Sequence, residues 1–339
     1  MENEIYLKED IGIHKYEQAY AIIGGKNIVN VYDEEGNFVP NTTKRKFGKK
    51  EYLQSNKKKN FEDTEYDYLD EEVVYIGFMR GHWGHFMVDS STRFWMLDRP
   101  ECKGRRFLIN IEGMDELYAK VFSYLGIDNE QVISLEQNTR FRAIYVPDLA
   151  YYPAKYISKE YLFPFEKIMS QINLQLPIYE KIYLSRIHFT KGKRELGEKD
   201  IQDVFKKNGC HIIYPEELSL EEQIWYYKNC KTMITTNGTI AHNAIFCNRD
   251  AELIILNRFC EEENMHQRAI NLIKNIKVTY VNAYHPNVKG NKDDSLMWKT
   301  DDFLRFCQER DYRIPREICG RKLYLRILFK LPFLYRFFK

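Results

Sequence analysis

Short runs of Val, Ile, Tyr and Phe alternate with amphipathic stretches along the chain from residue 73 onward. Short apolar runs are typical of buried strands, whereas apolar residues three and four positions apart are typical of helices. In the first half this pattern predicts strands over residues 73–78, 106–111, 132–135 and 143–146, and helices over residues 85–97 and 115–125. The pattern indicates an α/β fold.

A helix around residues 161–172 and a break at Pro177 precede a second, more regular series. Strands are expected over residues 181–185, 211–214, 232–236 and 252–256, with helices over residues 199–208, 220–229 and 240–247. Strands that alternate with helices of this length form right-handed βαβ units and a parallel sheet. The second half is therefore predicted to be Rossmann-like.

A chain of 339 residues with 44% hydrophobic residues is long enough for two domains. We expect an N-terminal α/β domain over residues 1–165, a Rossmann-like domain over residues 178–315 and a tail over residues 321–339. Both α/β domains are expected to be Rossmann-like and to face a central cleft. Because open parallel sheets bind ligands beyond the carboxyl ends of their strands, polar residues directly after strands are the best candidates for a site.

The charge is unevenly divided. The tail has six Lys and Arg residues and no acid, whereas the remainder has 45 basic and 49 acidic residues, a net charge of −4. Lys322, Arg326 and Lys330 recur every four residues, and 12 of the 19 tail residues are aliphatic or aromatic. This predicts a basic amphipathic helix on an anionic membrane surface, with a core-packing helix as the alternative. The mildly acidic remainder argues against nucleic acid as a partner.

Two blocks of like charge come early in the chain. Residues 44–59 include eight basic residues and one acid, and residues 62–72 include seven acids and no base. Such blocks are typical of solvated loops, and a contact surface for an acidic partner or acceptor is the alternative.

The seven Cys residues form no Cys-x-x-Cys pair, which favours a reducing compartment. The N-terminus shows neither a basic start nor an apolar run. The expectation is a cytoplasmic protein, peripheral on the inner face of the cell membrane.

Two common nucleotide motifs are missing from the sequence. No Gly-x-Gly-x-x-Gly follows a predicted strand, and Gly24-Gly25-Lys26 lacks the spacing of a P-loop. This argues against a dehydrogenase and against an NTPase, and no cofactor is expected.

Basic residues follow the first strand of the second half. Ser185 and Arg186 end that strand, and Lys191, Lys193 and Arg194 come a few residues later. Arg and Lys side chains in a cleft can bind both charges of a diphosphate. A solvated basic loop is the alternative.

Polar turns follow two further strands. Asn237, Gly238 and Thr239 open a helix that continues through His242 and Asn243, and the N-terminus of a helix attracts anions. After the intervening strand, Ser219 and Glu222 form a capping box, so Glu222 is structural. Glu216 or Glu217 lies just past that strand and could hydrogen-bond a ribose.

The first half offers a cluster of ionisable residues. If a helix starts near Gly84, then His85, Asp89 and Arg93 are four residues apart and share one face. This arrangement resembles a site with tuned pKa values. A metal site of His82, His85 and Asp89 is the alternative, for which no fourth ligand is evident.

Taken together and in order, these segments resemble glycosyltransferase family 61, whose bacterial members build capsular and other surface polysaccharides. The resemblance rests on residues 84–89 with Arg93, residues 183–186, 194–198, 217–223 and 237–243, and it covers roughly residues 75–260. It implies a GT-B-like fold, a nucleotide-sugar donor and inverting transfer without an essential metal.

The resemblance implies transfer of a hexosyl or pentosyl group from a nucleotide sugar, favoured to be a UDP-sugar, to a glycan or lipid-linked acceptor. Asp89 is the first candidate for the base and His85 the second, and a pair in which Asp89 orients His85 is a further possibility. The alternative function is a non-catalytic nucleotide-sugar or glycan-binding protein of the same assembly pathway. The residues expected to bind the donor are Ser185, Arg186, Arg194, Glu217, Asn237, Gly238, Thr239, His242 and Asn243. Those expected to contact the acceptor or support the site are His82 and Arg93.

Overall fold

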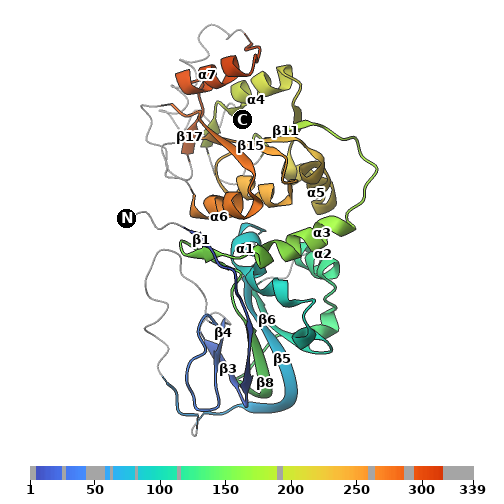
Figure 1. Ribbon diagram of the computed structural model, residues 1–339, viewed down its shortest axis with the longest axis vertical. Coiled ribbons are helices and arrows are strands. Elements are labelled where there is room, and N and C mark those ends of the chain that lie inside the picture. Colours follow the sequence, from blue (N-terminus) through green and yellow to red (C-terminus); the bar gives the residue numbers. More distant parts are fainter. Residues whose placement is uncertain are drawn as a thin grey trace. The chain divides into compact units, whose positions relative to one another are not determined.

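The computed structural model describes residues 5–24, 28–42, 58–61, 64–80, 83–112, 116–188, 194–258, 264–285 and 294–315. The chain folds into two compact units, Met1–Gln171 and Ile172–Lys339, which we describe separately (Figure 1). The fold is mixed α/β, as predicted. His82 and the predicted tail, residues 321–339, lie outside the described residues, and the domain ranges given above stay predictions.

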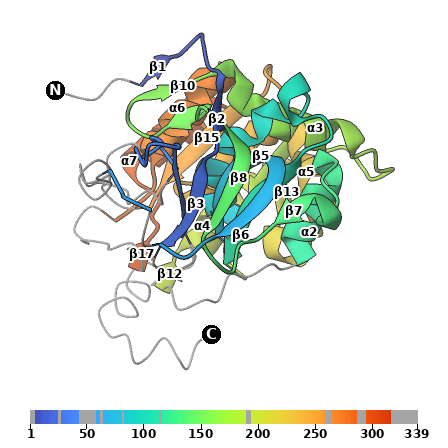
Figure 2. The ribbon, with the colours of Figure 1, turned by 90° about the horizontal axis from the view of Figure 1, so that it is seen from below.

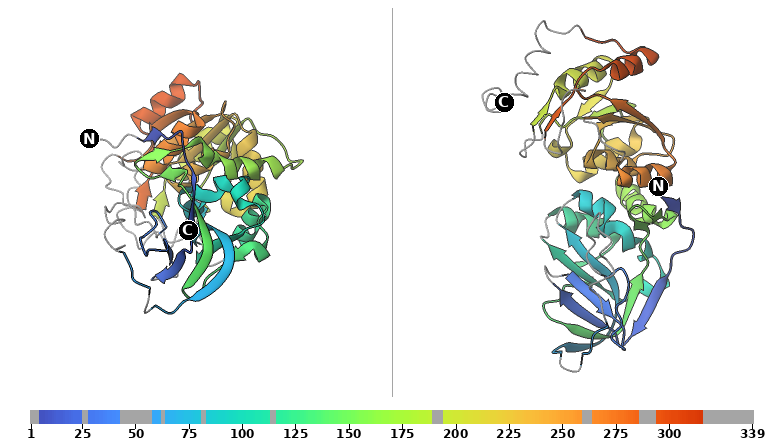
Figure 3. Two further views of the ribbon diagram at one scale, coloured as in Figure 1. Left: turned by 60° about the horizontal axis from the view of Figure 1, so that its bottom comes forward. Right: turned by 90° about the vertical axis from the view of Figure 1, so that its left-hand side faces the viewer.

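The first unit is built on a mixed sheet with the strand order β4-β3-β8-β5-β6-β7, and β2 pairs with β8 (Figure 2). Strands β5, β6, β7 and β8 run parallel, whereas β2, β3 and β4 are antiparallel additions at one edge, drawn in blue in Figure 3. The strands are β2 (Ile13–Glu17), β3 (Tyr20–Gly24), β4 (Ile28–Tyr32), β5 (Asp67–Arg80), β6 (Arg106–Glu112), β7 (Val132–Ile133) and β8 (Thr139–Pro147). The sheet therefore differs from the fully parallel sheet of a Rossmann-like domain.

The helices of the first unit pack against one another through aromatic rings. The ring of Phe86 lies 6.0 Å from that of Tyr118 and 6.3 Å from that of Phe165, and Phe94 lies 6.2 Å from Phe122. The helices are α1 (Trp83–Val88), η3 (Ser90–Met96), η4 (Pro100–Cys102), α2 (Glu116–Leu125), η5 (Asn129–Gln131), η6 (Lys159–Leu162) and α3 (Phe163–Gln171). A small separate sheet is formed by β1 (Tyr6–Leu7), β10 (Tyr156–Ile157) and β9 (Tyr151–Tyr152).

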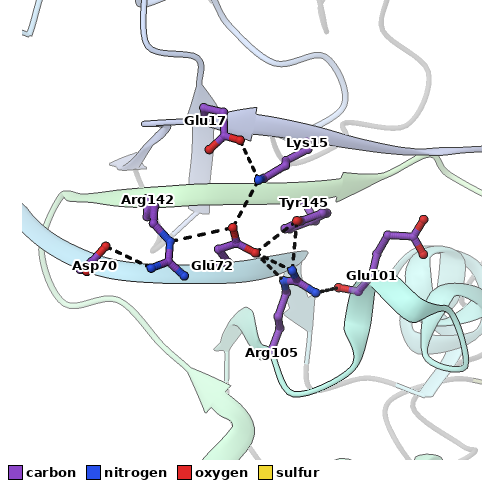
Figure 4. Close-up of polar contacts among 8 residues, drawn as sticks. All are labelled: Lys15, Glu17, Asp70, Glu72, Glu101, Arg105, Arg142 and Tyr145. Atoms are coloured by element: carbon purple, nitrogen blue, oxygen red, sulfur yellow. Dashed lines mark hydrogen bonds and ion pairs between the residues drawn. The ribbon is translucent and has the colours of Figure 1, made fainter.

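The acidic block at residues 62–72 is only partly a loop, because residues 67–72 open strand β5. The carboxylates of Asp70, Glu71 and Glu72 pair with arginine residues of neighbouring segments, so the strand tolerates them. Glu72 accepts hydrogen bonds from Arg105 and from the Tyr145 hydroxyl, and the Nζ atom of Lys15 lies 3.3 Å from Oε1 of Glu72 (Figure 4). Chiefly through the Arg105 bond, this network lowers the pKa of Glu72 to about 2 from an ordinary value of 4.5.

The second unit has a parallel sheet with the strand order β13-β11-β14-β15-β16, as the alternation of strands and helices predicted. The chain crosses from one side of β11 to the other after β13, so the order reverses between β11 and β14. The strands are β11 (Lys181–Leu184), β13 (His211–Ile213), β14 (Thr232–Thr236), β15 (Glu252–Asn257) and β16 (Lys277–Asn282). Open parallel sheets bind ligands at such a reversal.

Helices cover both faces of this sheet. One face packs against α4 and α7 through a cluster that includes Tyr183, Phe205 and Phe303. The helices are α4 (Glu198–Lys207), η7 (Pro215–Glu217), α5 (Leu220–Asn229), η8 (Thr239–Phe246), α6 (Met265–Lys274) and α7 (Asp301–Glu309), and a two-stranded sheet pairs β12 (Arg194–Leu196) with β17 (Asp294–Leu296). In the described part of the chain, no helix combines the length and apolar character needed to cross a membrane.

Two predicted helices differ from their expected form. The helix predicted over residues 85–97 divides into α1 and the 3₁₀ helix η3, and the one predicted over residues 240–247 is the 3₁₀ helix η8. Polar side chains bond to nearby carbonyl groups in both: Ser91 Oγ donates to Met87 O, Thr92 Oγ1 to Asp89 O and Asn243 Nδ2 to Ile240 O. Such local bonds compete with regular helical geometry.

Candidate functional site

In the first unit, His85 and Asp89 form a hydrogen-bonded pair at the end of α1. The Nδ1 atom of His85 lies 2.8 Å from Oδ2 of Asp89, and the two side chains are 31% and 22% exposed. Because a carboxylate only accepts hydrogen bonds, Nδ1 carries the proton and Nε2 is the basic nitrogen of the ring. The predicted spacing of four residues thus brings these two side chains together.

The second carboxylate oxygen of Asp89, Oδ1, does not hydrogen-bond to His85. Oδ1 is buried and has no hydrogen-bond partner among the described residues. A buried polar atom without a partner costs free energy, which a hydrogen-bond donor placed beside it would offset.

Tyr161 supports the segment that holds Asp89. Its buried hydroxyl donates to the carbonyl oxygen of Met87, and burial raises its pKa, with the charge of Asp89 adding to the effect. The phenol therefore stays protonated and acts as a fixed donor beneath the end of α1.

Arg93 takes part in structure rather than in a shared face with His85 and Asp89. Its guanidinium donates to the carbonyl oxygens of Asn41, Ile76 and Pro147. A shared face for His85, Asp89 and Arg93 requires an α-helix, which turns by about 100° per residue. The 3₁₀ helix η3 turns by about 120° per residue, and this rotates Arg93 away from the side of His85 and Asp89. These bonds connect Arg93 to three other segments of the first unit.

In the second unit, Ser185 and Arg186 follow β11, whose register pairs Leu184 with Thr235 of β14. Asn237 and Gly238 follow β14, so the four residues lie at the same carboxyl edge, at the reversal of strand order. The structure thus brings together the centre of the predicted donor site. Arg194 begins β12, and its side chain lies outside the description.

Glu198, which the sequence did not single out, fixes the backbone after β11. It is 2% exposed, and its Oε1 accepts from the backbone N–H of Arg186 at 2.8 Å and from the Tyr183 hydroxyl at 3.1 Å. Its position at the start of α4 was the available signal, because the first turn of a helix favours acids.

Asparagine side chains connect the ends of three strands. Asn237 Nδ2 donates to Asn257 Oδ1 at 3.2 Å, and Asn257 Nδ2 donates to Asn282 Oδ1 at 2.9 Å. We call Asn237, Asn257 and Asn282 the asparagine ladder. It holds the turn after β14 in a fixed position relative to β15 and β16.

Buried Arg258, also missed from the sequence, lies under the same turn. Its Nε donates to the Asn237 carbonyl at 3.1 Å, and a Cβ atom on Gly238 would lie 3.3 Å from its Nη2. Gly238 has a φ of 128° and a ψ of −165°, a conformation that is essentially restricted to glycine. Arg258 directly follows β15, which is the signal that could have identified it.

The residues of η8 divide into an exposed start and a buried remainder. Thr239 is exposed, whereas His242 and Asn243 are buried. His242 Nδ1 lies 2.9 Å from Gln267 Oε1, and burial lowers the pKa of His242, so its ring is neutral at pH 7. These contacts indicate that His242 attaches η8 to α6.

Glu217 pairs with a histidine that the sequence did not single out. Its Oε1 lies 2.5 Å from Nδ1 of His188, and the His188 ring stacks on Tyr214 at a centroid distance of 3.9 Å. All three residues follow β11 or β13 at the carboxyl edge of the sheet.

In the part of the chain that the structure describes, no group of three or more His, Cys, Asp or Glu side chains is placed to hold a metal ion. Comparison with known proteins adds one match: the family model described as Glycosyltransferase 61 matches residues 83–254. This range includes His85, Asp89, Arg186 and Gly238. No curated protein matches the chain significantly.

Proposed function

This chain belongs to glycosyltransferase family 61, and from that premise we propose that it transfers a sugar with inversion from a nucleotide-sugar donor, a UDP-sugar being favoured, to a glycan or lipid-linked acceptor. The proposal places this activity in the synthesis of a capsular or other surface polysaccharide. It includes metal independence and the GT-B-like arrangement expected from the sequence, in which residues of both units serve one reaction.

The donor diphosphate is assigned to the carboxyl edge of the second unit. Arg186 and the turn at Gly238 follow neighbouring parallel strands at the reversal of strand order. A guanidinium group and the backbone N–H groups of a turn both suit the charge that develops on a leaving diphosphate. The position of Gly238, without a side chain, allows a phosphate to approach the backbone.

The base is assigned to the pair of His85 and Asp89. During transfer, the acceptor hydroxyl oxygen forms a bond to C1 of the sugar while the bond from C1 to the phosphate oxygen breaks. The electron pair of the broken bond leaves with the nucleoside diphosphate, and the hydroxyl proton passes to the base. The contact of Nδ1 with Asp89 favours His85 Nε2 as the proton acceptor, with Asp89 orienting the ring and stabilising its charge.

The observation that carries this assignment is the buried Asp89 Oδ1, which has no partner among the described residues beside an imidazole held by the other oxygen. An acceptor hydroxyl that donates there would be positioned close to the same pair.

The test is a panel of nucleotide sugars, screened first for an increase in the melting temperature of the full chain, since a ligand of the native state stabilises it. The stabilising donor is then incubated with and without oligosaccharide acceptors while released nucleoside diphosphate is measured. We expect release that depends on the enzyme, and weaker donor binding in Arg186→Ala. Binding without any release or transfer would favour the non-catalytic alternative, and no binding at all would reject the proposal.

A further inference from the structure

The rings of His188 and Tyr214 stack on each other, and each ring also makes a polar contact. The two ring centroids are 3.9 Å apart and the ring planes differ by 12°. Glu217 Oε1 lies 2.5 Å from Nδ1 of His188, and Gln202 Nε2 donates to the Tyr214 hydroxyl at 3.3 Å. Each ring is therefore fixed both by stacking and by a polar contact.

Holding these groups costs conformational entropy that little burial offsets. The side chains of His188 and Glu217 remain 47% and 55% exposed, and an ion pair with this exposure contributes little to stability. A rigid aromatic surface that adds little to the fold is instead suited to a ligand, because a pre-positioned surface loses less entropy on binding.

The position of the pair indicates which ligand it fits. Ser185 N donates to Ile213 O, so Tyr214 lies beside Ser185 at the carboxyl edge of β11 and β13. His188 follows Arg186 by two residues, a separation of at most about 7 Å along the chain. A planar group bound at His188 would thus be within reach of phosphates bound at Arg186.

We propose that the exposed face of His188, backed by Tyr214, is the stacking surface for the nucleobase of the donor, and that Glu217 is a positioning residue for this imidazole. This inference rests on the proposed function and names a subsite within it. It reassigns Glu217, which acts through His188 rather than through a hydrogen bond to the ribose. Stacking is tolerant of base identity, because every base presents a flat π-face.

The sheet provides a matched control. His211 stacks on Tyr179 at a centroid distance of 3.6 Å, but it begins β13 and so lies at the amino edge. His211→Ala removes a histidine from an equivalent stacked pair without touching the proposed subsite.

The experiment measures, by calorimetry on the full chain, the affinities for UDP, CDP, ADP, GDP and inorganic pyrophosphate. His188→Ala should weaken binding of the preferred nucleoside diphosphate about 5- to 150-fold, the range for loss of one base–aromatic stack, and leave pyrophosphate affinity unchanged. His188→Phe should keep most of the nucleotide affinity, and His211→Ala should change neither. Glu217→Gln should raise the donor KM with little change in kcat, because it affects binding alone.

Equal nucleotide affinity in His188→Ala and the unaltered chain would overturn the subsite while leaving the transferase proposal intact. Parallel loss of pyrophosphate affinity would overturn it too, because His188 would then act on phosphate. If the unaltered chain bound none of the four nucleotides, the proposed transferase function itself would be rejected, and the subsite with it. Melting temperatures of the variants show whether each is folded. If the alanine variant is not, His188→Leu, which keeps a bulky side chain without an aromatic ring, replaces it and should show the same loss of nucleotide affinity.

Discussion

His85 contacts Asp89 through the ring nitrogen that carries its proton, and this fixes which nitrogen can act as a base. Replacing either residue should therefore affect the chemical step more than binding. We expect His85→Ala and Asp89→Asn to lower kcat about 10²- to 10⁴-fold, with little change in donor affinity. Steady-state kinetics together with calorimetry would separate the two quantities.

The exposed pair of Lys199 and Asp203 on α4 has the same spacing of four residues and provides the control, because Asp203→Asn should leave kcat unchanged. Unaltered turnover in both His85→Ala and Asp89→Asn would remove the pair from the mechanism.

Gly238→Ala should reduce both stability and donor binding. The backbone conformation at Gly238 costs a non-glycine residue about 1–3 kcal/mol, and the new Cβ would approach Arg258. Gly209 also has a positive φ, but nothing lies within 4 Å of a Cβ there. Gly209→Ala should therefore lower the melting temperature without changing donor affinity. Equal donor affinity in the two variants would show that the turn after β14 does not contact the donor.

Glu72 should make the stability of the first unit depend on pH. Its pKa is about 2 in the folded protein against an ordinary value of 4.5, so the ionised form stabilises the fold above about pH 4.5, and this contribution is lost as the pH falls towards 2. Glu72→Gln should lower the free energy of unfolding by about 1–2 kcal/mol at pH 7, with the difference from the unaltered chain shrinking below pH 4.5. Urea unfolding across this pH range measures the effect.

Glu130 is exposed in η5, and Glu130→Gln removes the same charge without removing a network of hydrogen bonds. This control should be nearly neutral at every pH. A Glu72→Gln difference that stayed constant down to pH 2 would contradict the lowered pKa.

The basic segment at residues 321–339 is expected to bind an anionic membrane surface. Removing it should release the protein from vesicles that contain phosphatidylglycerol and leave activity on a water-soluble acceptor unchanged. Co-sedimentation at low and high salt provides the measurement, since the electrostatic part weakens with salt. Equal co-sedimentation of the shortened and full chains would reject this expectation.

The sequence predicted the second unit better than the first for a physical reason. Buried parallel strands are continuous apolar runs, so β14 was predicted with the bounds that the structure has. The bounds of helix α5 also agree with the prediction. In contrast, β2 was not identified, because His14, Lys15 and Glu17 are exposed and interrupt any apolar run in this edge strand. The acids at the start of β5 are typical of a loop in the sequence, because the residues that pair with them, such as Arg105, are distant along the chain.

The candidate site shows the same division. Spacing along one helix was enough to predict the contact of His85 with Asp89, and strand ends were enough to bring Arg186 near Gly238. The hydrogen bonds of Arg93 could not be predicted, because they go to carbonyl groups of three distant segments. Arg258 and His188 each follow a strand, but the contacts that give them a role are with residues after other strands, at positions that only the register of the sheet defines.

The asparagine ladder continues past β16, since the backbone N–H of Asn282 donates to Asp302 in the first turn of α7. Side-chain amides and the Asp302 carboxylate therefore add connections at the ends of the strands, from the turn at Gly238 to α7, which packs on one face of the sheet. A donor that tightens the turn should thereby slow amide exchange at the start of α7. By thermodynamic reciprocity, loosening α7 should weaken the donor complex.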